Sequence, residues 1–241
     1  MTVNEIDRDG SAAAERPAGL DDALERILAG RYSCRAFRPE PVPRQRIERM
    51  FTLAQRTASW CNSQAWQVIL TSGEATERFR AALYAAASAG PGRSDVPEPA
   101  EYRGVYQTRR REAGYGLYHS LGIDRADYAA RGRQMLENFR FFGAPHVAVI
   151  TSDRSLGPYG YVDCGGYVST LLLAAESLGV AAVPQAAIAM QSDAVRAHFG
   201  IPADRVIVCG VSFGYADADH PANSFRTGRE ELANVVTWHD R

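Results

Sequence analysis

The most restrictive feature of the sequence is a long apolar run from Tyr161 to Leu178 that is nearly free of charged side chains. A helix with so little polar surface has to be covered on more than one side. We therefore expect this segment to be the central helix of the fold, closed by Gly179. Short apolar runs typical of buried strands occur at 66–72, 146–152 and 205–216. Because strands and helices mix without a strict βαβ alternation, the sequence predicts an α+β or mixed α/β fold.

Further helices are expected where apolar residues recur at the spacing of one helix face. In 20–30, for example, Leu20, Leu24 and Leu28 have the spacing of core residues, and Gly30 ends the helix. The other expected helices cover 44–57, 74–89, 125–142 and 192–200. Residues 1–18 have the composition of a flexible tail, and 19–241 are expected to form a single domain. Within it, a segment of about 90–122, rich in Pro, Gly, Arg and Tyr, is expected to be irregular, as a variable lid-like insertion.

The composition excludes several classes of function. With 241 residues, 46% of them hydrophobic, and a formal net charge of -1, the chain lacks the excess of cations that nucleic acid or an anionic membrane requires. No apolar run has the length of a membrane span, and the polar start lacks the apolar stretch of a signal peptide. The four cysteines form no C-x-x-C pair and are too sparse for a disulfide scaffold. We therefore expect a cytoplasmic protein.

The run Gly210 to Gly214, GVSFG, matches the G-x-S-x-G pattern of serine hydrolases and follows an apolar strand-like segment. A nucleophile elbow must lead directly into a helix, whereas the residues after Gly214 include Pro221 and several Asp. A close-packed strand end is therefore the favoured explanation, with a serine hydrolase as an alternative. The five histidines are scattered without metal-ligand spacing, so no metal site is predicted.

Two arginines and a serine alternate in the stretch RYSCR. In an extended chain, Arg31, Ser33 and Arg35 point to the same side and could hold a small anion between them. No P-loop and no dinucleotide-binding glycine motif is present, so a bound phosphate would have to be held by arginines. Solvated surface arginines are the simpler alternative for each of these residues taken singly. Three other segments have the composition of a ligand site, namely ASWCNSQAW with Asn62 and Gln64, VPQAA with Pro184, Gln185 and Ala186, and NSFRTGR with Arg226 and Arg229.

The combination and order of these four segments resemble the FMN-dependent nitroreductase family, from about residue 20 to residue 236. The resemblance implies that Arg31 and Ser33 bind the phosphate and ribityl end of FMN, with Tyr32 in the same segment. It also implies that Arg35 reaches the pyrimidine side of the flavin ring. A guanidinium there stabilises the negative charge of the reduced flavin.

The same resemblance gives roles to the other three segments. Asn62, with Gln64 in support, looks like the residue that hydrogen-bonds the pyrimidine edge. The turn at Pro184, Gln185 and Ala186 looks like the one that covers one ring face and offers a backbone N–H to flavin N5. Arg229 and Arg226 would complete the phosphate site, and the resemblance leaves open which of the two contacts the phosphate.

As a whole, the resemblance implies a nitroreductase-like three-layer α-β-α sandwich with a central mixed sheet, in an interwoven homodimer. It implies an oxidoreductase in which NADPH or NADH delivers hydride to flavin N5 and leaves before a nitroaromatic or quinone acceptor binds. Because the flavin carries the chemistry, no catalytic acid or base is assigned. A flavin-binding protein without turnover is a further alternative.

The segment of about 90–122 is where selectivity for the acceptor is expected. Its tyrosines could form an aromatic lid, and the three arginines Arg109 to Arg111 could attract a carboxylate or the extra phosphate of NADPH. For the arginines, a solvated helix face with tyrosines packed beneath it is the favoured alternative. The tyrosines concerned are Tyr102, Tyr106, Tyr115 and Tyr118.

Overall fold

Four strands form one sheet in the order β1-β2-β4-β3 in the computed structural model, which describes residues 19–240. The predicted flexible tail, 1–18, lies outside the described residues. The expected mixed sheet is antiparallel in all four strands, and one parallel bridge, between Ser33 and Ala182, joins the segment after the first helix to its edge. The strands are β1 (Trp66–Ser72), β2 (His146–Asp153), β3 (Ala181–Gln185) and β4 (Arg205–Gly214).

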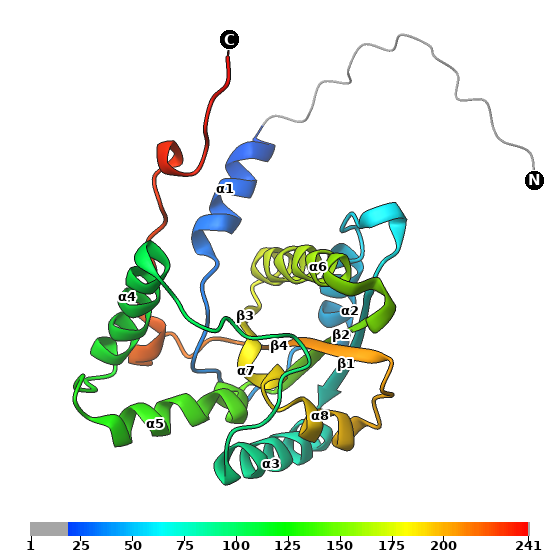
Figure 1. The fold of residues 1–241 in the computed structure, drawn as a ribbon, viewed down its shortest axis with the longest axis vertical. Coiled ribbons are helices and arrows are strands. Elements are labelled where there is room, and N and C mark those ends of the chain that lie inside the picture. Colours follow the sequence, from blue (N-terminus) through cyan, green and yellow to red (C-terminus); the bar gives the residue numbers. More distant parts are fainter. Residues whose placement is uncertain (1–18, 241) are drawn as a thin grey trace, which may run out of the picture.

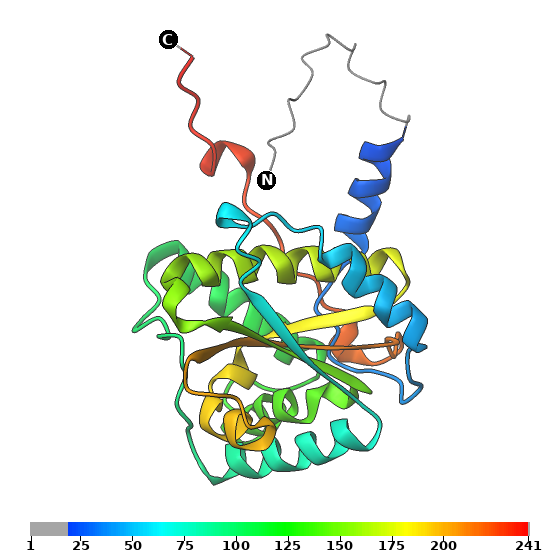
Figure 2. The ribbon, with the colours of Figure 1, turned by 90° about the vertical axis from the view of Figure 1, so that its right-hand side faces the viewer.

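Helices cover both faces of this sheet, which makes three layers (Figure 1, Figure 2). Strand β2 shows why, because its alternate residues enter two different cores. Ala148 and Ile150 pack with α2 (Arg44–Ala54) and α6 (Gly157–Ser177). Val147 and Val149 instead face the second core, which is covered by α3 (Glu74–Ala89), α7 (Ala186–Ala189) and α8 (Ser192–Phe199). The expected three-layer α-β-α sandwich is confirmed.

The predicted central helix is α6, which begins at Gly157 rather than Tyr161 because Pro158 is accommodated in its first turn. Tyr167, Leu171 and Ala175 are buried on its sheet-facing side. No helix among residues 19–240 is long and apolar enough to cross a membrane.

The expectation of an irregular segment over 90–122 is only half right. Residues 90–103 are non-regular, but a helix of 17 residues, α4 (Gly104–Ser120), follows them. Its three glycines and its arginine run hide any apolar periodicity, so the pattern that identifies helices is missing from the sequence. The α4 helix and the next one, α5 (Tyr128–Leu136), lie together at one side of the molecule (Figure 1).

The helix expected over 125–142 is shorter than the apolar pattern indicates. It ends as α5 and continues as a 3-10 helix, Glu137–Gly143, in which Phe141 and Phe142 adopt positive φ angles of 59° and 53°. This conformation is unfavourable for aromatic residues. Arg80 stabilises it, since its guanidinium lies over the Phe141 ring and donates hydrogen bonds to the carbonyls of Arg140 and Ala144.

The first helix, α1 (Leu20–Gly30), has the bounds predicted for it, but its apolar face does not enter the core. Leu20, Leu24 and Leu28 are each at least half exposed, and no residue of α1 is buried. Figures 1 and 2 show α1 and the C-terminal segment projecting from the same end of the molecule. The apolar periodicity of α1 therefore indicates a surface that the described chain leaves uncovered.

The side chain of His146 ties β2 to the chain before α2. Its Nε2 accepts a hydrogen bond of 2.9 Å from the Val42 N–H, so the neutral ring carries its proton on Nδ1 and donates it to the Ser72 hydroxyl, also at 2.9 Å. The ring is 2% exposed and stacks on Phe213. Burial lowers the pKa of His146 below its ordinary value of 6.5.

This arrangement makes stability depend on pH. As the pH falls through 6.5, the unfolded chain binds more protons at this position than the folded chain, so the free energy of unfolding should fall as the pH is lowered through 6.5 towards the lower pKa of the folded chain. Urea unfolding should show that His146→Gln reduces this slope, at a cost of about 1–3 kcal/mol at pH 7.5. The control is His119→Gln at an exposed position. Equal slopes for wild type and His146→Gln would contradict the assignment.

Candidate functional site

The RYSCR stretch runs along the open edge of β3. Ser33 forms a parallel bridge with Ala182, and the Cys34 N–H donates a hydrogen bond of 3.2 Å to the Ala182 carbonyl. This pairing satisfies backbone groups of an edge strand and places Ser33 and Cys34 beside Ala182. The Cys34 side chain is fully buried, and burial raises the pKa of its thiol to about 11, which makes it a poor nucleophile.

A cavity of about 370 Å³ opens between this stretch and the C-terminal segment, and we call it the arginine cradle. It brings together six of the residues that the sequence singles out: Arg31, Tyr32, Ser33, Arg35, Arg226 and Arg229. The other residues that line it are Leu28, Ala29, Phe225 and Thr227. The two ends of the domain, nearly 200 residues apart in sequence, therefore meet at one site.

The charges of the arginine cradle are suited to an anion. Among residues 19–240, none of its four arginines forms an ion pair with a carboxylate. Arg35 donates to the Ser33 carbonyl at 3.3 Å, and burial lowers the pKa of its guanidinium. Arg226 lies 3.7 Å from the centre of the Tyr32 ring. Four cations around one cavity repel each other, so a bound phosphate or carboxylate would stabilise them.

Asn223 holds the arginine cradle together, and the sequence analysis did not assign it a role. Its side chain is 3% exposed and accepts a hydrogen bond of 2.7 Å from the Arg35 N–H. Its amide donates to the carbonyls of Ala36, at 2.9 Å, and Asp217, at 2.7 Å. The signal lay in the quoted stretch NSFRTGR, but a single Asn in a loop is more often a turn residue.

The turn expected at residues 184–186 is instead the end of β3 and the start of α7, because Pro184 and Gln185 pair with β4. Pro184 and Ala186 are exposed. Gln185 is 2% exposed, and its amide donates to the Asn138 carbonyl at 2.8 Å. Its side-chain oxygen accepts a hydrogen bond from the buried Ser212 hydroxyl. The side chain of Gln185 thus joins β3 to β4 and to the 3-10 helix, and it does not enter the site.

The same hydrogen bond decides against the serine-hydrolase alternative. Gly210 to Gly214 form the last part of β4, and Ser212 pairs in register with Val147 and Val183 on the neighbouring strands. Its side chain is fully buried, without the strand-to-helix turn and the exposed hydroxyl that a nucleophile elbow requires. The glycines belong to a close-packed strand.

Asn62 and Gln64 lie apart from the arginine cradle. They belong to a loop before β1 in which Cys61, Asn62 and Gln64 all have positive φ angles of about 50°. This loop is held on the first half of α6, where the Asp163 carboxylate accepts hydrogen bonds from the Trp60 N–H and the Ser63 hydroxyl. The predicted polar cluster is therefore formed, but at a different place from the arginines.

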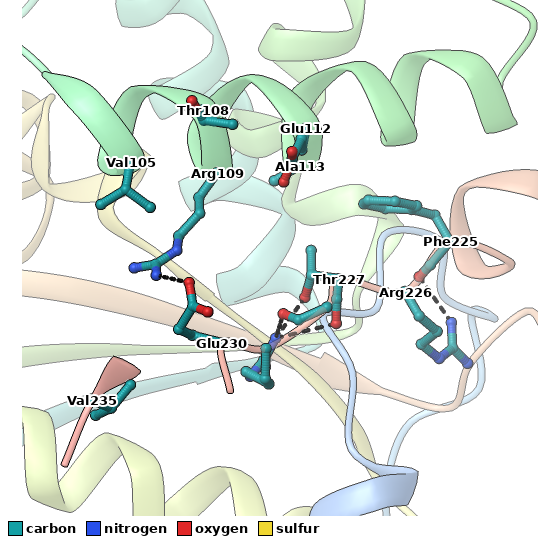
Figure 3. A pocket seen from close by; sticks show the side chains of 12 residues that line it. Val105, Thr108, Arg109, Glu112, Ala113, Phe225, Arg226, Thr227, Glu230 and Val235 are labelled. Atoms are coloured by element: carbon teal, nitrogen blue, oxygen red, sulfur yellow. Dashed lines mark hydrogen bonds and ion pairs between the residues drawn. The ribbon is translucent and has the colours of Figure 1, made fainter. Parts of the chain in front are cut away.

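A second and larger cavity, of about 880 Å³, adjoins the arginine cradle, and we call it the α4 cavity (Figure 3). The two cavities share a wall formed by Phe225, Arg226, Thr227 and Arg229. The opposite wall is α4, which contributes Val105, Thr108, Arg109, Glu112 and Ala113. Residues 19–240 contain no group of three or more His, Cys, Asp or Glu side chains placed to hold a metal ion.

The fold and the arginine cradle define an α+β protein with a cavity lined by four arginines beside the edge of its sheet. Comparison with known proteins specifies the family. The family model described as "Nitroreductase family" matches residues 28–215. The chain belongs to the nitroreductase family.

Two characterised relatives and one solved structure support this membership. The chain is 37% identical over 220 residues to nitroreductase NfnB of Mycolicibacterium smegmatis, covering 91% of this chain and 94% of the relative. It is 34% identical to a 4-nitrobenzoate reductase of Nocardioides sp., covering 91% and 92%. The crystal structure of the FMN-dependent nitroreductase NfnB from Mycobacterium smegmatis in complex with NADPH superposes with a TM-score of 0.88, at 36% identity, covering 91% of this chain and 99% of the other.

Removal of the Asn223 side chain tests how the arginine cradle is held. Asn223→Ala leaves one buried N–H and two carbonyls without this partner, so the free energy of unfolding should fall by about 1–3 kcal/mol. The neighbouring Ser224→Ala, at an exposed position, is the matched control and should be near neutral. Chemical denaturation measures both, and equal stability of the two variants would show that Asn223 is not a structural clamp.

Proposed function

We propose that this protein is an FMN-dependent NAD(P)H nitroreductase that holds the FMN phosphate in the arginine cradle. The observation that carries the proposal is the assembly of four arginines that form no ion pair with a carboxylate of residues 19–240, at a segment paired with the edge of β3. A phosphate dianion satisfies such a group by charge-assisted hydrogen bonds. The FMN named for NfnB presents a phosphate of this kind.

Each segment of the site then has a distinct task. Arg31, Ser33 and either Arg226 or Arg229 bind the phosphate and ribityl end. Arg35, whose backbone is held by Asn223, places its cation on the pyrimidine side, where negative charge accumulates on reduction. Pro184 and Ala186 are exposed, so the backbone of this segment is free to contact one face of the flavin ring.

FMN, when bound, supplies hydride transfer from a nicotinamide to a separate acceptor. We propose NADPH or NADH as the reductant, nitroaromatic compounds or quinones as the acceptors, and a ping-pong order because both must use the same ring face. The chain's own residues provide orientation, charge and exclusion of water. No side chain is required as an acid or base. All four cysteines are free thiols, which fits the cytoplasm as the proposed location.

The site requires a second copy of the chain to be complete. The Asn62 loop is held at Asp163, and the arginine cradle lies near Glu176, which crowds Gly30 at the end of α1. At about 1.5 Å per residue, these two points lie about 20 Å apart along α6. A two-fold axis that packs α6 against its partner's α6 in the antiparallel sense would place the loop of one chain at the arginine cradle of the other.

Exposed apolar surfaces support this homodimer. On α6, Val162, Gly165, Gly166 and Ser169 form an exposed stripe of small residues, which permits the close approach of another helix. On α1 the three leucines are uncovered, and the projecting C-terminal segment exposes Leu232, Val235 and Trp238. Surfaces of this kind are expected to be buried against a partner.

An anaerobic spectrum tests the proposed chemistry. The protein reconstituted with FMN should lose its visible flavin absorbance on addition of NADPH or NADH, and a nitroaromatic acceptor should restore it. A flavin that stays oxidised with both reductants would favour the alternative of a flavin-binding protein without turnover.

Substitution in the arginine cradle tests the proposed site. Arg31→Gln and Arg229→Gln each remove a charge-assisted hydrogen bond donor, so the Kd for FMN should rise about tenfold or more. Arg78→Gln, on the exposed face of α3, is the matched control. Quenching of flavin fluorescence on binding gives the Kd. If both cradle variants bind FMN with the affinity of the wild type, the FMN phosphate does not lie in this cavity.

The oligomeric state tests the dimer. Light scattering should give the mass of two chains for the wild type, and Leu24→Glu should shift it towards one chain because it charges the exposed face of α1. FMN binding should weaken in the same variant. Met135→Glu, equally exposed but on α5, should change neither property. A wild-type monomer that binds FMN tightly would rule out a site completed by a partner.

A further inference from the structure

The α4 cavity gives a role to one of the three consecutive arginines of α4. Arg109 lines this cavity, whereas Arg110 lies over the ring of Tyr102, 5.2 Å from its centre, and Arg111 is exposed outside it. Of the four tyrosines of the predicted aromatic lid, Tyr115 and Tyr118 are covered by the guanidinium groups of Arg125 and Arg131. The lid itself stays a prediction. The functional candidates in this segment therefore reduce to Arg109.

Contacts between α4 and the C-terminal segment hold Arg109 in place. Gly116 leaves no room for a Cβ against the Phe225 ring, so α4 packs closely on the wall that the two cavities share. Arg109 Nη2 donates to Glu230 Oε2, as Figure 3 shows. Glu230 is itself held, because its Oε1 accepts hydrogen bonds from Asn234 Nδ2 at 2.8 Å and from the Glu231 N–H at 3.1 Å.

This arrangement orients the guanidinium of Arg109 without using all of its donors. Glu230 is the only hydrogen-bond acceptor of the Arg109 side chain among residues 19–240, and it engages Nη2 alone. Nε and Nη1 stay available to a ligand in the α4 cavity. Asn234 and Arg109 lower the pKa of Glu230 to about 2, so the carboxylate keeps its orienting charge at neutral pH.

The charges around the two cavities also favour an anion beyond the FMN phosphate. Together the cavities are lined by five arginines, namely Arg31, Arg35, Arg109, Arg226 and Arg229, and by two glutamates, Glu112 and Glu230. A phosphate dianion in the arginine cradle still leaves one positive charge in excess. An excess of positive charge along the walls of the two cavities attracts an anionic ligand.

We propose that Arg109 is a specificity-determining residue that binds an anionic group of the substrate remote from the reacting atoms. The inference rests on the proposed function, because it assumes a reductant and an acceptor at the flavin. The anionic group is a phosphate or a carboxylate. Two substrates could supply it, because NADPH differs from NADH by a 2′-phosphate and 4-nitrobenzoate differs from nitrobenzene by a carboxylate. Glu230 acts through Arg109 as a positioning residue.

The test compares matched pairs of substrates in the FMN-loaded protein. For wild type, Arg109→Gln and the control Arg111→Gln, kcat/KM is measured for NADPH and NADH with nitrobenzene, and for 4-nitrobenzoate and nitrobenzene with NADH. Arg109→Gln should lower the ratio of the anionic to the neutral substrate about tenfold or more in at least one pair. The pair that responds identifies the source of the anion.

A second variant and an equilibrium measurement guard against a trivial loss of folding. Glu230→Gln keeps a side-chain oxygen that can accept a hydrogen bond from Arg109 but removes the negative charge that competes with a bound anion, so it should raise the same ratio that Arg109→Gln lowers. Binding of NADP+ against NAD+, and of 4-aminobenzoate against aniline, to the oxidised protein is followed by the change in flavin absorbance. The anionic member of the responding pair should bind more weakly to Arg109→Gln and unchanged to Arg111→Gln.

The outcomes separate this inference from the proposed function. The proposed function needs turnover of NADPH or NADH with a nitroaromatic acceptor, so absence of that reaction in the wild type with either reductant and either acceptor would contradict the proposed function itself. If that reaction proceeds and both substrate ratios of Arg109→Gln and Glu230→Gln equal those of the wild type, Arg109 binds no substrate anion and the inference is overturned.

Discussion

The attachment of residues 31–36 to the open edge of β3 is the contact on which the rest of the site depends. A strand edge leaves N–H and C=O groups without partners. Here the Cys34 N–H pairs with the Ala182 carbonyl of β3, and the Asn223 side chain pairs in turn with the backbone N–H of Arg35 and the carbonyl of Ala36. The alternation of an extended segment then directs Arg31, Ser33 and Arg35 into one cavity. The same few hydrogen bonds therefore attach this segment to the edge of the sheet and bring the charges of Arg31 and Arg35 to one cavity.

Helix α6 sets the distance between the two polar groups of the site. The Asp163 carboxylate holds the Asn62 loop near its beginning, and Glu176 lies against the end of α1 near the arginine cradle. A rigid helix cannot shorten this separation, so a single chain keeps the two groups apart. In the proposed dimer the same helix, repeated by a two-fold axis, becomes the element that unites them.

Much of the fold and part of the site could be predicted from the sequence. Three of the four strands and most helices follow from apolar periodicity, and six of the predicted residues do meet in one cavity. Three expectations needed correction for different physical reasons. Helix α1 shows a regular apolar face that no part of the described chain covers, α4 has no periodicity to detect, and the turn expected at 184–186 is the end of β3 and the start of α7. Periodicity reports how much of a surface is apolar, but not what covers it.

By itself, the sequence determined three of the strands, most of the helices and the residue types that could hold a phosphate, because these properties are local. Only the tertiary structure decided that Arg226 and Arg229 join the RYSCR stretch while Asn62 and Gln64 do not. It also buried Ser212 in a strand, which removed an otherwise acceptable catalytic motif. The reason is that binding requires side chains to converge in space, and convergence depends on hydrogen bonds and packing between residues far apart in the chain.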